Sequence, residues 1–146
     1  MTSPATANEP RYATATLEPS KAMRRVGYGL SVLAVLFLLM DIAMKLLALP
    51  IVLTSSAQLG YPGTPAMAHT LGILLLACTA LYVYPRTAVL GAVLLTAFLG
   101  GTVATHLRIG NPLFTHTLFG VYLALFLWGG LWLRDAGLRA LFPWHR

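Results

Sequence analysis

Charged residues and cysteine are scarce in this chain of 146 residues. Asp, Glu, Lys and Arg make up only 10% of it, against about 25% in ordinary soluble domains. Hydrophobic residues account for 58%, and the mean hydropathy is +0.75. This composition excludes an ordinary soluble domain and indicates an integral membrane protein.

The near absence of cysteine and the absence of common catalytic motifs exclude several kinds of site. The single cysteine, Cys78, excludes an intramolecular disulfide, a C-x-x-C redox pair and a thiolate metal site. The G-x-S-x-G, G-x-x-x-x-G-K-[ST] and H-E-x-x-H motifs are absent, which argues against a hydrolase or an ATPase. The net charge of +6 does not indicate nucleic-acid binding, because most Lys and Arg residues flank apolar segments.

Four apolar segments are long enough to cross a bilayer, which takes about 20 residues each. We expect spans at about 27–49, 65–84, 87–107 and 113–133. The connections after the second and third spans are so short that these neighbours must be antiparallel. The predicted fold is therefore all-α: an up-down-up-down four-helix membrane bundle over residues 21–134.

Three further segments complete the predicted organisation. Residues 1–20 contain no apolar run and predict a disordered tail. Residues 135–146 mix Leu, Phe and Trp with Arg and His, which is typical of an interfacial tail. Between the first two spans, residues 50–60 begin with proline and end with glycine, which predicts a short interfacial helix.

The distribution of basic residues predicts the orientation of the bundle. Cytoplasmic loops of membrane proteins carry an excess of Lys and Arg. One set of connections is rich in them and the opposite set contains only Arg108, so we expect both termini in the cytoplasm. The basic residues on the predicted cytoplasmic side are Lys21, Arg24, Arg25, Arg86, Arg134, Arg139 and Arg146.

Ionisable residues inside the spans gather toward the predicted outer end. Asp41 lies about 20 Å along the first span, and Lys45 follows one turn later. An ionisable residue in the bilayer costs about 2.5–3.5 kcal/mol and usually finds a partner in the bundle interior. We expect Asp41 to pair with Lys45, Arg108 or a histidine, either as a structural ion pair or as part of a site. The other spans contribute His69, His106, Arg108 and His116 to the same layer.

The histidines are candidates for ligand or proton contacts, or are simply hydrogen-bonded interfacial side chains. A metal or haem site is not favoured, because ten residues separate His106 from His116 and neither of their spans carries an acidic residue. Thr102 and Thr105 share a helix face with His106, although threonine commonly bonds to its own helix. We predict that Asp41, Lys45, His106, Arg108 and His116 line one outer pocket, roofed by residues 50–60.

Several motifs resemble the DoxX-like family of small bacterial membrane proteins, over about two thirds of the chain. The motifs are Asp41-x-x-x-Lys45-Leu46, Leu59-Gly60-Tyr61-Pro62, Tyr84-Pro85-Arg86-Thr87-Ala88-Val89-Leu90-Gly91, Gly100-Gly101-x-x-Ala104-Thr105-His106-x-Arg108, Asn111-Pro112-Leu113-Phe114 and Trp128-Gly129-Gly130-Leu131-Trp132-Leu133-Arg134. The resemblance implies a four-helix protein of the bacterial cytoplasmic (inner) membrane. Some members of the wider DoxX/DoxD group are associated with thiosulfate:quinone oxidoreduction or with membrane oxidoreductase complexes.

Three functional hypotheses follow. In the first, the chain binds a quinone and serves as an accessory to a membrane or peripheral oxidoreductase subunit, which supplies the electrons. In the second, it is a non-enzymatic assembly protein in contact with membrane lipid, and its ionic layer fixes helix register. The third is a small-solute transporter. The sequence contains no catalytic motif that would act alone.

Overall fold

The computed structural model describes residues 18–141, and these residues form helices and turns without any β-strand. This confirms the all-α prediction. In chain order the helices are α1 (Lys21–Leu46), α2 (Pro50–Gln58), α3 (Pro65–Val83), α4 (Ala88–Arg108), the π-helix η1 (Leu113–Thr117), α5 (Phe119–Arg134) and α6 (Ala136–Leu141).

Four helical segments are long and apolar enough to cross a membrane, which agrees with the predicted spans. They are Lys21–Leu46, Pro65–Val83, Ala88–Arg108 and Leu113–Arg134, the last formed by η1 and α5 together. The orientation of this bundle in a membrane stays a prediction. Most of the predicted tail over residues 1–20, and residues 142–146 of the C-terminal tail, lie outside the described residues.

The first span differs from its predicted limits at both ends. Helix α1 begins at Lys21 because the Ser20 hydroxyl accepts a hydrogen bond from the Met23 amide at 3.1 Å and caps the helix. It ends at Leu46, because Ala48 adopts the left-handed conformation (φ 47°) and turns the chain toward α2. The proline at position 50 is the first residue of α2 and lies beyond this turn.

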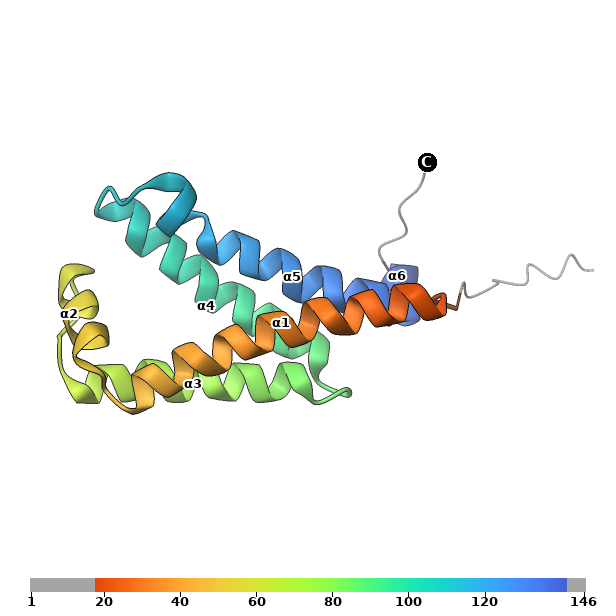
Figure 1. Cartoon of the computed structure of the whole chain (residues 1–146), viewed down its shortest axis with the longest axis horizontal. Helices are drawn as coiled ribbons and strands as arrows, with labels where there is room; N and C mark the ends of the chain where they lie inside the picture. Colours follow the sequence, from red (N-terminus) through yellow and green to blue (C-terminus); the bar gives the residue numbers. More distant parts are fainter. Residues whose placement is uncertain (1–17, 142–146) are drawn as a thin grey trace, which may run out of the picture.

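The four long helices form a ring in which α1 packs against α3 and α5, and α4 packs against the same two helices. The start of α1 and helix α6 lie at one end of the molecule, which we call the terminal end (Figure 1). Helix α2 lies at the opposite end, which we call the α2 end. Toward the α2 end, α4 and α5 diverge from α1 and α3, so the bundle is V-shaped.

Glycines bring the helix backbones together near the terminal end. A Cβ atom added to Gly91 of α4 would lie 2.2 Å from the Tyr82 backbone nitrogen of α3. A Cβ atom on Gly130 of α5 would lie 2.4 Å from Ser31 Oγ, and one on Gly27 of α1 would lie 2.8 Å from the Gly130 carbonyl oxygen. In lipid, where apolar burial does not drive helix association, such close approach supplies van der Waals contact.

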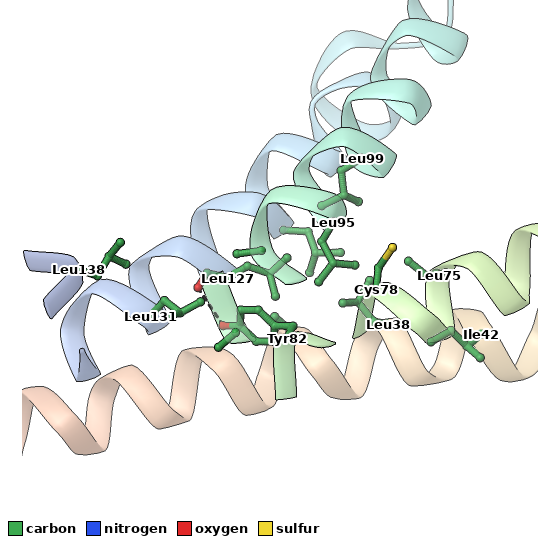
Figure 2. Close-up of a cluster of buried hydrophobic side chains, with 14 residues drawn as sticks. Leu38, Ile42, Leu75, Cys78, Tyr82, Leu95, Leu99, Leu127, Leu131 and Leu138 are labelled. Carbon is green, nitrogen blue, oxygen red and sulfur yellow. Dashed lines mark hydrogen bonds between the residues drawn. The ribbon is translucent and has the colours of Figure 1, made fainter. Parts of the chain in front are cut away.

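Tyr82 joins three of the four spanning helices at this narrow end of the V. Its hydroxyl donates to the Leu127 carbonyl of α5 at 2.9 Å, so its own oxygen accepts from Ser31 Oγ of α1, also at 2.9 Å. Figure 2 shows Tyr82 pointing toward Leu127, with leucines of all four long helices around it. Because lipid offers no competing water, this network fixes the relative register of α1, α3 and α5.

We expect Gly91→Ala to destabilise the bundle by at least about 2 kcal/mol, because its methyl group meets the backbone of α3, which cannot move aside as a side chain would. Gly100→Ala on the same helix is the matched control. A Cβ atom there meets nothing within 4 Å, and alanine favours helix, so stability should hold or rise. Unfolding in detergent measures both variants, and equal stabilities would contradict the close-contact account.

Candidate functional site

A cavity of about 520 Å³ lies between the diverging helices at the α2 end. This volume falls within the range of small-molecule sites, about 300–1,000 Å³. Its walls come from α1, α3, α4 and α5, and α2 adds residues from the side of the connecting loop. Phe37 of α1 and Phe119 of α5, whose ring centroids are 4.9 Å apart, also line the cavity. Most of the lining is apolar, and the polar groups form a smaller set.

Asp41 and Lys45 form an ion pair on the wall contributed by α1. Their spacing of four residues, with the acid first, is the favourable order for a pair on one helix. The Asp41 side chain is 32% exposed and the Lys45 side chain is 17% exposed. Gly72 lets α3 approach closely here, because a Cβ atom at this position would lie 3.1 Å from Lys45 Cβ. The pair therefore offers both charges to the cavity.

His106 of α4 lines the cavity and is held by Asn111 in the following turn. The Asn111 amide nitrogen lies 2.6 Å from His106 Nδ1. An amide nitrogen only donates, so Nδ1 accepts, and the proton of the neutral ring sits on Nε2. His106 is thereby prepared to donate a hydrogen bond from Nε2.

His116 lies across the same turn, and its ring centroid is 6.0 Å from that of His106. It belongs to the π-helix η1, in which Leu118 bonds to the Leu113 carbonyl five residues earlier. A π-helical turn is wider than an α-turn and often occurs at functional sites. Thr115 Oγ1 lies 2.8 Å from His116 Nδ1, so the second imidazole is also held through its Nδ1 atom.

Thr102 and Thr105 line the cavity, and both donate to their own helix, as the sequence analysis considered. The Thr102 hydroxyl donates to the Leu99 carbonyl at 2.7 Å, and Thr105 donates to the Gly101 carbonyl at 2.8 Å. Each hydroxyl proton is therefore engaged, and toward a ligand these groups act only as acceptors.

Two of the predicted site residues do not line the cavity. His69 is an exposed residue near the start of α3 and is absent from the lining. Arg108 is exposed at the end of α4, and its guanidinium donates to the Leu59 carbonyl at 2.7 Å instead of entering the cavity. The structure thus brings together Asp41, Lys45, Thr102, Thr105, His106 and His116.

Helix α2 contributes to the cavity wall, in keeping with the predicted roof over residues 50–60, whereas Asn111 was not among the predicted site residues. Asn111 stands beside a proline in the short turn after α4, and its place in a family motif gave it no role in the site. The signal was its position five residues after His106, across a helix C-terminus where the chain folds back. Ser55, Ser56 and Tyr61 also line the cavity with hydroxyl groups, and none of the three was among the predicted site residues.

Comparison with protein families gives a match over most of the chain. The profile of the DoxX-like family of proteins matches residues 29–130. This range contains every lining residue of the cavity and all of α2, α3 and α4. No curated protein and no solved structure shows a significant match.

The Asp41-Lys45 pair predicts a non-additive effect on stability. Asp41→Leu alone leaves the Lys45 ammonium unpaired in an apolar wall, and we expect a loss of about 1–2 kcal/mol. A fully buried pair would cost about 3–5 kcal/mol, and these side chains keep part of their exposure. The double variant Asp41→Leu/Lys45→Met removes both charges and should recover most of the loss. Unfolding midpoints of the two single variants and the double variant test this, and strict additivity would contradict it.

Proposed function

This chain belongs to the DoxX-like family, and from that premise we propose that it binds a quinone-like lipophilic ligand in the cavity at the α2 end. We further propose that it does so as an accessory component of a redox system in the inner membrane of a bacterium. The predicted orientation, with both termini in the cytoplasm, would place the cavity in the outer leaflet. The observation that carries the proposal is the convergence of polar groups from α1, α4 and η1 on one apolar cavity.

The chemistry of the lining suits a quinone. A quinone headgroup presents two carbonyl oxygens, which need hydrogen-bond donors, and it carries an apolar tail. His106 offers an Nε2–H donor, and Lys45 offers an ammonium group on the opposite wall. Asp41 stands beside Lys45 and is available to exchange a proton. The leucine and phenylalanine side chains of the cavity supply an apolar surface for the tail.

The scarcity of redox-active groups in the chain supports the accessory role. Reduction of a quinone needs an electron donor, and this sequence has one cysteine, Cys78, buried in the packed core. Among residues 18–141, no group of three or more His, Cys, Asp or Glu side chains could hold a metal ion. In this proposal the electrons come from a partner subunit, and the chain supplies a place to hold the quinone and groups to move its protons.

The alternative of a purely structural ionic layer is less well supported. An ion pair fixes helix register when its partners come from different helices. Asp41 and Lys45 both belong to α1, so their pairing joins no two helices. The register is instead supported by Tyr82 and the glycine contacts near the terminal end. Neither the Asp41-Lys45 pair nor His106 joins two spanning helices, and this favours a binding role for these groups.

Quinone binding should depend on His106 and not on His69. Removing a hydrogen-bond donor to a buried carbonyl weakens binding by about 1–1.5 kcal/mol, so His106→Ala should raise the Kd about tenfold. His69→Ala is the matched control, because it removes an imidazole near the same end but outside the cavity. Equilibrium dialysis of a labelled short-chain benzoquinone against the purified protein in detergent measures both. Equal Kd values for the two variants, or no saturable binding, would contradict the proposal.

Filling the cavity should weaken binding without loss of stability. Gly101 lines the cavity, and a Cβ atom there meets nothing within 4 Å, so Gly101→Leu should place its side chain in the space of the ligand. Gly100→Leu is the matched control, since its neighbourhood is equally open but it is not a lining residue. We expect at least a tenfold weaker Kd for Gly101→Leu only. Unchanged benzoquinone binding in Gly101→Leu would place the ligand elsewhere.

A further inference from the structure

Arg108 bonds to the protein's own backbone next to the cavity. Its guanidinium donates at 2.7 Å to the carbonyl of Leu59, the C-cap residue that directly follows α2. Two residues later, the Tyr61 hydroxyl lies 3.2 Å from Thr105 Oγ1. Because the Thr105 proton is engaged by the Gly101 carbonyl, Tyr61 is the donor in this contact. Both contacts tie the end of α2 to α4.

These ties act on a helix that forms part of the cavity wall. Ile51, Val52, Ser55, Ser56 and Leu59 line the cavity, and Ser56 is only 8% exposed. Beyond the ties to α4, α2 packs mainly on α3. Movement of α2 away from α4 would therefore expose the cavity while the four spanning helices keep their packing.

The backbone at both ends of α2 has the conformation of a tight turn. Ala48 precedes the helix with φ 47°, and Gly60 follows it with φ 82°. The left-handed conformation is unfavourable for alanine, so the contacts around Ala48 must hold this turn. Gly60 also leaves room for the Arg108 guanidinium, because a Cβ atom at position 60 would lie 2.8 Å from Arg108 Nη2. A residue with positive φ thus stands near each end of α2.

We infer that Arg108 is a positioning residue that fastens α2 over the cavity and so controls how readily a lipophilic ligand enters. The inference rests on the proposed function of the cavity, but it assigns Arg108 a role that does not involve touching the ligand. An arginine suits this role because its charged fork donates strongly to a backbone carbonyl from the end of a long side chain. Loss of the Arg108 and Tyr61 contacts would free the end of α2 from α4, while its packing on α3 remains.

Alkylation of a thiol introduced on the buried side of α2 tests this inference without any ligand. In a Cys78→Ala background of the full chain, Ser56→Cys places a nearly isosteric thiol on the cavity side of α2. We expect Arg108→Gln to raise its rate of maleimide labelling in detergent about fivefold to tenfold, the factor for one ordinary hydrogen bond, because Arg108 is exposed and water weakens the advantage of its charge. Arg108→Lys keeps the charge but not the fork, so its rate should be intermediate.

Two controls separate opening of α2 from general loosening. Ser31→Cys, in the same background, reports on the terminal end, where the native serine is 4% exposed and bonds to Tyr82. Its labelling rate should not change with Arg108→Gln. Arg25→Gln removes the same charge from an exposed position on α1 and should leave the Ser56→Cys rate unchanged.

The labelling rates at positions 56 and 31 can each contradict the inference. An unchanged Ser56→Cys rate in Arg108→Gln, or an equal rise at Ser31→Cys, would overturn it. If Arg108→Gln does not fold, Tyr61→Phe tests the same fastening and should raise the rate about twofold to threefold, whereas no rise would overturn the inference. Labelling needs no quinone, so the two tests can fail separately. A failure of benzoquinone binding would refute the proposed function, whereas the labelling rates would still show whether Arg108 fastens α2.

Discussion

The close backbone contact near the terminal end is the constraint on which the rest of the structure depends. Gly91 lies against the backbone at Tyr82, and Gly27 and Gly130 bring α1 and α5 together. In lipid, helices associate through such contacts and through internal hydrogen bonds, since burial of apolar surface gives no advantage. The Tyr82 network adds those hydrogen bonds between α1, α3 and α5. Helices that touch so closely at one end and cross at an angle must separate at the other.

The cavity is therefore a consequence of packing at the opposite end of the bundle. Its walls are the faces that the diverging helices no longer bury against one another. Small residues such as Gly101 widen it, and phenylalanines such as Phe37 and Phe119 give it an apolar surface. Polar side chains that would be costly in lipid find space and partners there. The same architecture thus supplies both a stable bundle and a place for a lipophilic molecule.

The tertiary structure separates polar groups that join helices from polar groups that bond only within their own helix or turn. Tyr82 and Ser31 use their hydroxyl groups to join helices, and they are buried. Asp41 pairs within its own helix, and His106 is held by the turn that follows it, so neither joins distant parts of the bundle. Arg108 stands between these classes, since it connects two elements of the cavity wall from outside the cavity.

The sequence by itself determined the class, the four spans and the layer in which the polar groups gather. These follow from long apolar runs, from the prolines and glycines between them and from the cost of charge in a bilayer, all of which are local properties. Only the tertiary structure decided which polar groups meet. The direction of a side chain depends on where its helix ends and how that helix packs. The turn at Ala48 ends α1 early, and η1 forms a wide turn before α5. The side chain of Arg108 lies over Gly60. His69 shares the layer and yet lies outside the cavity, because depth along a helix is set by sequence, whereas the face it presents is set by its neighbours.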